Sequence, residues 1–345
     1  MDELLLKERI AAHLAQQTGT VWDIEEVKPL PGGACQDNLL VVAVENGFPA
    51  MRLVLRSDAP RPLQGSLKRE QELNVITAAV SAGVKTPPAR WFGADLVRNT
   101  AGGYFMDWVE GTAIGRKVVT SAQLAGARMR LAAELAEQLV RIHSILPTTY
   151  PQLISSLGAP PDDPTEAVLR QLQKSVETFV EPHPALDLAI RWLWDHKPAV
   201  ESVNLVHGDF RVGNFMVSPV GLVAVVDWEF AHWGSIYEDL GWISVRDWRF
   251  GQNKLPVGGF SDRETFLSAY ERYSGRTINR RTVRFWEAVG NVRWAVGCVQ
   301  QGERYLSGEQ QDIELLAISL RTSEMEYEAL RLIERMEECV DAEKT

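Results

Sequence analysis

The string HGDFRVGNFMV, followed closely by VVDWEF, constrains the fold of this chain more than any other feature. It sets His207, Asp209 and Asn214 at the spacing H-x-D-x-x-x-x-N and places Asp227 at the end of an apolar run. Two short apolar runs separated by a turn with Pro and Gly lie between Asn214 and Asp227, and this pattern predicts a β-hairpin. The hairpin would bring Asn214 and Asp227 to one edge, where a cation can bridge their side chains.

These residue types suit phosphoryl transfer from a nucleotide. That reaction needs a carboxylate that orients and deprotonates the attacking hydroxyl, and oxygen ligands that hold Mg²⁺ on the phosphates. Asp209 suits the first task, and Asn214 with Asp227 suits the second. Each residue alone also has a structural explanation, because Asp beside Gly often forms a turn and Asn before a strand often forms a cap. Their combined spacing around a hairpin favours the chemical interpretation.

The strings HGDFRVGN and VVDWEF resemble the catalytic loop and metal-binding segment of the aminoglycoside phosphotransferase and choline kinase superfamily, which has a protein-kinase-like fold. The resemblance implies an α+β, bilobal protein with a small antiparallel-sheet N-lobe and a larger, mainly helical C-lobe. It places the nucleotide-binding lobe at 1–105, a hinge at 106–112 and the catalytic and substrate-binding lobe at 113–345. It also implies Mg²⁺, with ATP or GTP as the co-substrate whose γ-phosphate moves to a hydroxyl of a small molecule.

Three further residues of the C-lobe are expected to support the site. In this family His207 mostly holds the catalytic loop by hydrogen bonds, and we favour that role over a chemical one. Asp239 in SIYEDLGWI corresponds to the residue that braces the same loop, although the Gly-Asp-Pro found there in the family is missing. Glu229 follows Asp227 by two residues, so an extended backbone would aim both carboxylates the same way. Support of the metal and a purely structural role remain open for Glu229.

The amino-terminal third has the pattern expected of the small lobe. Strands are predicted at 24–30, 39–44 and 51–56, with a turn that contains Gly32 and Gly33 after the first. A glycine turn between strands lets backbone N–H groups approach phosphates closely. Most such turns only reverse the chain, but the position of this one upstream of the catalytic loop favours phosphate binding.

The family places a cation on the third strand, where it grips the nucleotide phosphates and pairs with a Glu on the next helix. The usual Lys is replaced here by Arg56, which keeps the charge and can bind phosphate with two N–H groups, but has a larger, planar head group. A subset of the family, the domains associated with acyl-CoA dehydrogenases, also shows V-L-R at this point. On the helix predicted within 66–84, Glu70 is the expected partner, with a plain surface role as the alternative, and Glu72 is the second choice.

The string YFMDWVEG at 104–111 resembles the hinge that binds the purine through main-chain groups. We expect Met106, Asp107, Trp108 and Val109 to supply those groups, so that their side chains do not reveal whether the purine is adenine or guanine. Beyond the hinge, helical spacing predicts a long helix ending near 145 and two helices within 166–200.

Composition limits the class of protein. The chain has 345 residues and a formal net charge of -10, and it lacks the dense basic face of a nucleic-acid binder. Its three cysteines are widely spaced and predict neither disulfides nor a metal cluster. The charged first residues are unlike a signal peptide, and no stretch approaches the roughly 20 apolar residues of a membrane span. We expect a cytoplasmic monomer or homodimer without nucleic-acid or membrane partners.

The acceptor is the least determined feature of the sequence. An aminoglycoside pocket needs a dense set of carboxylates, and only dispersed ones are present. Arg284, Arg293 and Arg304 lie among apolar residues, in a segment that resembles the acyl-CoA-dehydrogenase-associated kinases and favours an anionic or acyl-type hydroxyl substrate. Three alternatives stay open: an aminoglycoside 3'-type kinase, a hydroxyacyl-CoA-type kinase, and a catalytically idle nucleotide-binding module, which the Arg at position 56 would suit.

Overall fold

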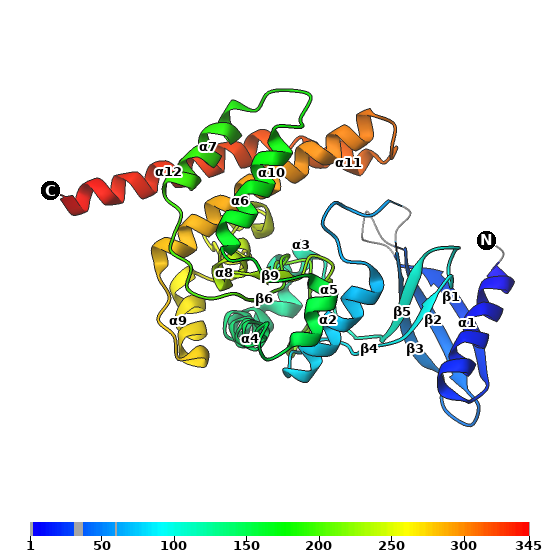
Figure 1. Cartoon of the computed structure of the whole chain (residues 1–345). Helices are drawn as coiled ribbons and strands as arrows, with labels where there is room; N and C mark the ends of the chain where they lie inside the picture. Colours follow the sequence, from blue (N-terminus) through cyan, green and yellow to red (C-terminus); the bar gives the residue numbers. More distant parts are fainter. Residues whose placement is uncertain (1–2, 31–36, 59–60, 345) are drawn as a thin grey trace.

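The computed structural model describes residues 3–30, 37–58 and 61–344. A five-stranded antiparallel sheet lies at one end and a mainly helical body at the other (Figure 1). The order in the sheet is β1-β2-β3-β5-β4. Its strands are β1 (Trp22–Pro29), β2 (Asp37–Glu45), β3 (Met51–Ser57), β4 (Ala89–Ala94) and β5 (Gly102–Asp107). The expected fold class, a small antiparallel lobe followed by a larger helical one, is confirmed.

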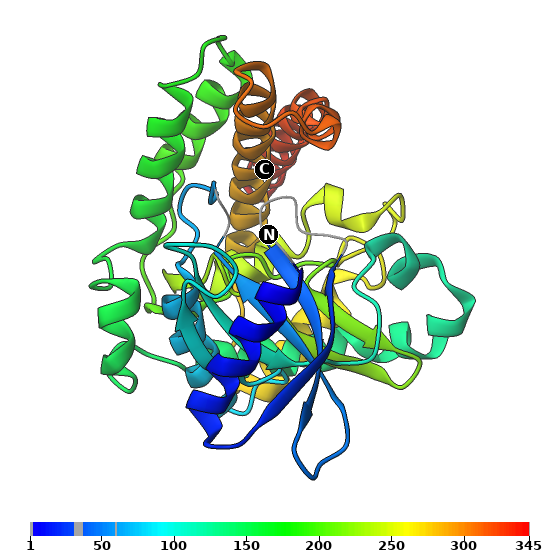
Figure 2. The same cartoon turned by 90° about the vertical axis from the view of Figure 1, so that its right-hand side faces the viewer.

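The sheet is covered on one side by α1 (Glu3–Thr18), as both views show (Figures 1 and 2). Leu6, Ile10 and Leu14 recur at every fourth position, so they form one apolar stripe of the helix. They are buried against alternate strand residues, among them Leu53 and Leu55 of β3. The period of two in β3 therefore sends Leu53 and Leu55 into this small core, while Arg56 faces the other way.

Between the sheet and the helical body lies α2 (Arg69–Ser81), which packs on β4 and β5 (Figure 1). Its buried face contains Glu72, Val75, Ile76 and Ala79, which follow helical spacing. The chain leaves the helix through Gly83, whose φ of 78° is typical of a helix end. The predicted helix is therefore confirmed, and its polar member Glu72 is buried in the direction of the helical body.

The helical body surrounds one large apolar core that also includes the buried face of α2. The long helix predicted to end near 145 is α4, and the two predicted within 166–200 are α6 and α7. The helices of this part are α3 (Gly115–Thr120), α4 (Ala125–His143), α5 (Ile154–Leu157), α6 (Pro164–Val176), α7 (Pro184–Asp195), α8 (Ile236–Trp242), α9 (Arg263–Ser274), α10 (Arg280–Leu306), α11 (Ile313–Ser319) and α12 (Thr322–Lys344). Among the described residues, no helix is both long and apolar enough to cross a membrane.

Two small sheets within the helical body carry the motif residues. The strand β6 (Asn204–Val206) pairs with β9 (His232–Gly234), and β7 (Phe215–Ser218) pairs with β8 (Gly221–Val225). The second pair is the predicted hairpin. Thr112 exchanges two backbone hydrogen bonds with Val217 of β7, at 2.9 and 3.0 Å, so the segment after β5 is fixed directly to the hairpin.

Candidate active site

The segment from His207 to Asn214, which we call the motif loop, starts where β6 ends. Gly208 has a φ of 75°, and a Cβ at this position would clash with the Phe230 carbonyl oxygen. Both facts require glycine in the H-G-D string. The Gly208 N–H and the His207 N–H donate to the two carboxylate oxygens of Asp239, at 3.0 and 2.8 Å. Asp239 of α8 therefore holds the start of the loop, as the sequence predicts.

Asp239 is itself held by His143, which is not among the predicted site residues. His143, at the end of α4, donates from Nε2 to Asp239 Oδ2 at 3.2 Å and accepts at Nδ1 from the Tyr270 hydroxyl at 2.8 Å. Burial alone would raise the pKa of Asp239, but the hydrogen bonds from the His143 ring and the His207 N–H outweigh burial and lower it. Three separate elements thus meet at one buried carboxylate.

His207 has the contacts of a scaffold residue. Its Nδ1 accepts from the Asp209 N–H and its Nε2 donates to the Val226 carbonyl oxygen, both at 3.2 Å. Burial lowers the pKa of His207 below its ordinary value, which keeps the ring in the neutral form that this pair of bonds requires. The ring joins the loop at Asp209 to the segment that precedes Asp227.

The Asp209 carboxylate is buried and accepts hydrogen bonds from three side chains. Asn214 Nδ2 donates to Oδ2 at 2.6 Å, Trp242 Nε1 donates to Oδ1 at 2.8 Å, and Arg211 Nε lies 2.9 Å from Oδ1. Neither Arg211 nor Trp242 is among the predicted site residues. Arg211 could have been predicted from the sequence, because it lies inside the HGDFRVGN motif. The proximity of Trp242 to Asp209 depends on how α8 packs.

The hairpin brings Asn214 and Asp227 together at its open end. The Val226 N–H donates to the Asn214 carbonyl oxygen at 2.9 Å, one residue before Asp227. Since the Asn214 side-chain amide donates to Asp209, its Oδ1 is directed away from that carboxylate. Asp227 has a φ of 72°, a left-handed conformation that Asp tolerates better than most residues and that is concentrated at functional sites. Asp209 and Asp227 therefore belong to one connected group of residues.

Arg56 of β3 reaches this group from the sheet. Its Nη2 donates to Asp227 Oδ1 at 2.8 Å and to Glu72 Oε1 at 3.1 Å. Burial alone would raise the pKa of Asp227, but the charge and hydrogen bond of Arg56 lower it. The Arg side chain thus bridges the sheet, α2 and the hairpin.

The predicted partner of Arg56 was wrong. Glu70 is exposed, whereas Glu72 is fully buried and accepts from Arg56, from Arg69 Nη1 at 2.6 Å and from the Trp228 N–H at 3.2 Å. Two residues turn an α-helix by about 200°, so Glu70 and Glu72 face nearly opposite directions. The signal was present in the sequence, because Glu72 lies on the same stripe as Val75, Ile76 and Ala79.

Glu229 is buried and lies near Asp227, but not for the reason expected from an extended backbone. The left-handed φ of Asp227 breaks the alternation on which that argument relied. Glu229 Oε2 lies 3.5 Å from Arg69 Nη2, at the limit of a hydrogen bond. Burial and the charge of Asp227 raise the pKa of Glu229 to about 7. The contact with Arg69 and the raised pKa favour a role of Glu229 in the ion-pair network around Arg69 over a role as a permanently charged ligand of a metal.

The predicted purine-binding segment begins inside the sheet. Met106 and Asp107 are residues of β5 that pair with Val54 and Leu53. The Trp108 N–H donates to the Arg52 carbonyl oxygen at 3.0 Å, so this group is already used within the protein. Val109 is the next residue beyond this pairing. Gly32 and Gly33 lie outside the described residues.

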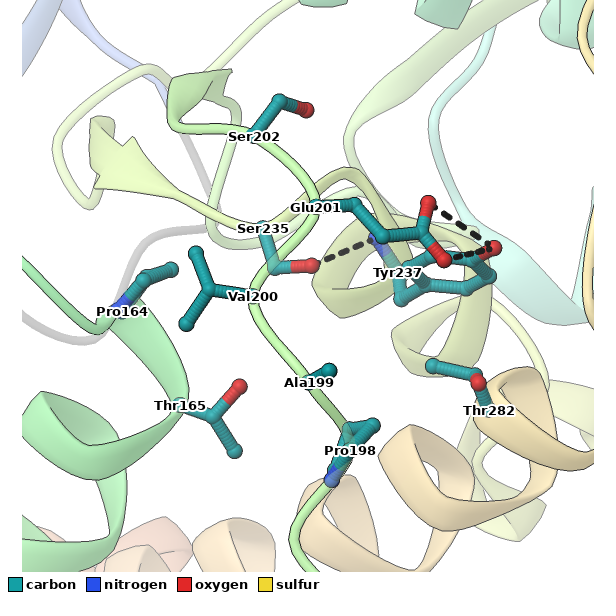
Figure 3. Close-up of a pocket in the computed structure, with 10 residues that line it drawn as sticks. All are labelled: Pro164, Thr165, Pro198, Ala199, Val200, Glu201, Ser202, Ser235, Tyr237 and Thr282. Atoms are coloured by element: carbon teal, nitrogen blue, oxygen red, sulfur yellow. Dashed lines mark hydrogen bonds between the residues drawn. The ribbon is translucent and has the colours of Figure 1, made fainter.

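Another region of the helical body contains a small pocket, of about 240 Å³ including space open to solvent. Figure 3 shows the loop from Pro198 to Ser202 facing the starts of α6, α8 and α10. The Tyr237 hydroxyl donates to Glu201 at 3.2 Å, and the Ser235 hydroxyl accepts from the Tyr237 N–H (Figure 3). None of the predicted site residues is among those that line it.

Comparisons with known proteins agree with this geometry. A family model described as a phosphotransferase enzyme family matches residues 26–286. Acyl-CoA dehydrogenase family member 10 of Mus musculus is 28% identical over 203 residues, which are 55% of this chain and 18% of that protein. The chain spans about a third or less of the length of the curated relatives it matches.

Solved structures show the same fold at low sequence identity. A putative aminoglycoside phosphotransferase from Ralstonia eutropha has a TM-score of 0.75 and 21% identity, with 95% of this chain and 98% of that chain covered. A spectinomycin phosphotransferase in complex with ADP and spectinomycin has a TM-score of 0.60 and 14% identity, with 94% and 98% covered. With a family model that covers most of its length and this shared fold, the chain belongs to the phosphotransferase enzyme family.

Proposed function

We propose that the group built around Asp209, Asp227 and Arg56 transfers the γ-phosphoryl group of ATP or GTP to a hydroxyl of a small molecule. The observation that carries this proposal is the direct connection from Asp209 through Asn214 to the hairpin end, and from Asp227 to Arg56. A base, oxygen ligands and a phosphate-binding cation are therefore adjacent. Phosphoryl transfer depends on such positioning and charge stabilisation.

Each residue has a defined role in this proposal. Asp209 orients the acceptor hydroxyl and takes its proton as the oxygen attacks the γ-phosphorus, while the bond from the γ-phosphorus to the bridging oxygen breaks and the nucleoside diphosphate leaves. Arg56, held by Glu72, contacts the phosphates, and backbone groups near Val109 contact the purine. His207 and Asp239 keep the loop in place. The compartment we propose is the cytoplasm, where nucleoside triphosphates are the ordinary phosphoryl donors.

Asn214 and Asp227 fit Mg²⁺ as ligands. Mg²⁺ is usually held by one or two carboxylates together with phosphate and water oxygens. Asp227 supplies a carboxylate of lowered pKa, and Asn214 supplies an amide oxygen that points away from Asp209. A bound Mg²⁺ would neutralise charge on the nucleotide phosphates. Its arrival would require Asp227 to share its carboxylate between the metal and Arg56.

The acceptor that the surroundings of Asp209 suit best is anionic or of acyl type. Arg211 stacks on the Trp248 ring at 4.5 Å, and Arg293 stacks on the Trp242 ring at 4.8 Å. Glu238, the acidic residue nearest to Arg293, is buried and bound to it at 2.8 Å. Arg284 donates to Glu287 and Arg304 donates to Gln310, whereas Arg293 covers Trp242, the residue that donates to Asp209. Guanidinium groups in these positions disfavour a polycationic aminoglycoside.

The test compares nucleotide consumption by the wild type and Asp209→Asn. ATP and GTP are offered with aminoglycosides, choline, ethanolamine, hydroxy acids and hydroxyacyl thioesters. We expect the variant to lose about 10²- to 10⁴-fold in turnover, with unchanged nucleotide affinity by calorimetry. Asp262→Asn is the matched control, because Asp262 caps α9 outside the site and Asn caps equally well.

Three results would contradict parts of the proposal. Equal turnover by wild type and Asp209→Asn would remove Asp209 as the base. Nucleotide binding without consumption on any acceptor would favour the idle nucleotide-binding module. Turnover confined to aminoglycosides would overturn the proposed acceptor class and leave the phosphotransfer chemistry intact.

A further inference from the structure

The indole N–H of Trp242 is directed at the carboxylate of Asp209. The Nε1–Oδ1 distance is 2.8 Å and the tryptophan is only 5% exposed. An indole has a single hydrogen-bond donor and no acceptor. The one polar group of this large buried side chain is therefore used on the residue that we assign as the base.

Packing fixes the Trp242 ring on both sides. A Cβ on Gly290 of α10 would lie 3.2 Å from Trp242 Cε3, so the absence of a side chain at position 290 leaves room for the ring. Arg293, one turn further along α10, covers a face of the indole at 4.8 Å and is held there by Glu238 at 2.8 Å. Trp248 packs beside it, with ring centroids 5.4 Å apart. The donor direction of Trp242 is thus set by α8 and α10.

The Asp209 carboxylate needs such a donor. Rotation about the last bond of an Asp side chain has broad, weakly separated minima, so the rotamer alone does not fix the carboxylate plane. Asn214 fixes Oδ2 and Trp242 fixes Oδ1. The third donor, Arg211, is 26% exposed, so it is less restrained than the buried Asn214 and Trp242.

We propose that Trp242 is a positioning residue for the base: its N–H holds Asp209 Oδ1 so that the free lone pairs of the carboxylate face the acceptor hydroxyl. The kinetic part of this inference rests on the proposed function. The structural part, a specific hydrogen bond between these two side chains, does not. Because a misplaced reacting group can cost about 10²-fold in rate, loss of this N–H should lower kcat while nucleotide binding stays unchanged.

The chain contains a matched control. Trp248 is also 5% exposed, yet its Nε1 has no hydrogen-bond partner within the described part of the chain. Trp242→Phe removes an N–H that donates a hydrogen bond, whereas Trp248→Phe removes an N–H without such a partner among the described residues. Both variants retain an aromatic ring. Replacing Trp242 with 3-benzothienylalanine keeps the shape of the indole and exchanges only the N–H for sulfur, which covers the case in which Trp242→Phe folds poorly.

The first experiment needs no activity. Thermal unfolding is measured for Trp242→Phe, Asp209→Ala and the double variant, and likewise for Trp248→Phe with Asp209→Ala. Residues in contact give non-additive effects, so we expect the Tm loss of the Trp242 double variant to be clearly smaller than the sum of its single losses. The Trp248 pair should be closer to additive. Equal coupling for both tryptophans would overturn the specific hydrogen bond.

The second experiment measures turnover with Mg-ATP and the best acceptor of the panel, or with water as acceptor if none is found. The benzothienyl variant should lose about 10- to 100-fold in kcat, with unchanged KM for ATP, and Trp248→Phe should lose less. If kcat is unchanged while the unfolding data show clear coupling, the hydrogen bond between Trp242 and Asp209 exists but the positioning role of Trp242 is refuted. Absence of wild-type turnover would count against the proposed function, and the unfolding result would then decide whether the hydrogen bond exists.

Discussion

Arg56 of β3 and Asp227 at the end of the hairpin are joined by a hydrogen bond of 2.8 Å across 171 residues of sequence. Their side chains are 9% and 28% exposed, and the same Arg nitrogen also contacts the fully buried Glu72. This single guanidinium therefore connects the five-stranded sheet to the segment that carries the proposed metal ligand. Arg56, at the position where the sequence pattern led us to expect Lys, is thus one of the contacts that hold the two parts together.

Two substitutions of Arg56 should distinguish the contribution of its positive charge from that of its planar head group. Arg56→Met leaves Asp227 without its cation and Glu72 with Arg69 alone, and we expect a loss of about 3–5 kcal/mol in the free energy of unfolding together with weak nucleotide binding. Arg56→Lys keeps the charge but not the planar head group, so both losses should be intermediate. Urea unfolding and calorimetric titration with ADP are the measurements.

Arg52 on the same strand is the control for Arg56. It pairs with Glu110 at 2.7 Å, but the two side chains are 46% and 79% exposed. Exposed ion pairs contribute little, so Arg52→Met should have a small effect on unfolding. An equal effect of the two Arg→Met changes would contradict the role given to Arg56.

Glu72 and Glu70 provide a second pair two residues apart. Glu72→Gln weakens the buried contacts with both Arg56 and Arg69, and we expect a loss of about 3–5 kcal/mol in unfolding free energy and a higher Kd for nucleotide. Glu70→Gln should leave both quantities unchanged, because the Glu70 side chain is exposed. The reverse result would restore the partner expected from the sequence pattern.

His207 should make the protein less stable as the pH falls. Burial lowers its pKa in the folded state below the ordinary value of 6.5, so near and below that pH the unfolded chain binds the proton more readily. The free energy of unfolding then decreases as the pH falls through this range. His207→Gln keeps a side-chain N–H donor without a titrating ring. The Tm difference between wild type and variant should shrink between about pH 8 and about pH 5.

The raised pKa of His232 changes the stability with pH in the opposite direction. His232 is present in both the wild type and His207→Gln, so its effect cancels in the Tm difference between them. A difference in Tm that stays constant with pH would show that His207 does not titrate differently in the folded protein. Thermal unfolding monitored by circular dichroism across the range is sufficient.

Asp227→Asn should weaken metal binding rather than proton transfer. Loss of one carboxylate ligand is expected to raise the Kd for Mn²⁺ in the presence of ADP by about tenfold or more, since even groups that only support a ligand contribute about 10- to 100-fold. Asp209→Asn should leave this Kd unchanged. Mn²⁺ titration followed by electron paramagnetic resonance measures both, and equal effects of the two variants would contradict the assignment of Asp227 as a ligand.

The residues that the sequence located correctly are those whose neighbours are set by local structure. His207, Asp209 and Asn214 share one loop, and a hairpin of known turn chemistry joins Asn214 to Asp227, so spacing alone predicts their proximity. Asp239 came from the family resemblance and lies where that pattern placed it. Glu70 was chosen from the same kind of pattern and was wrong, because the apolar stripe of Val75, Ile76 and Ala79 places Glu72, and not Glu70, on the buried face of α2.

Sequence alone therefore determined the hairpin and the spacing of the motif residues, because these depend on period, turn residues and distance along the chain, while the class of fold followed from the family resemblance. The tertiary structure decided the partners that come from distant elements: Glu72 and Asp227 on Arg56, His143 on Asp239, and Trp242 on Asp209. Those contacts arise where helices and sheet bury polar groups that must find each other away from water. No local pattern specifies which two segments will meet there.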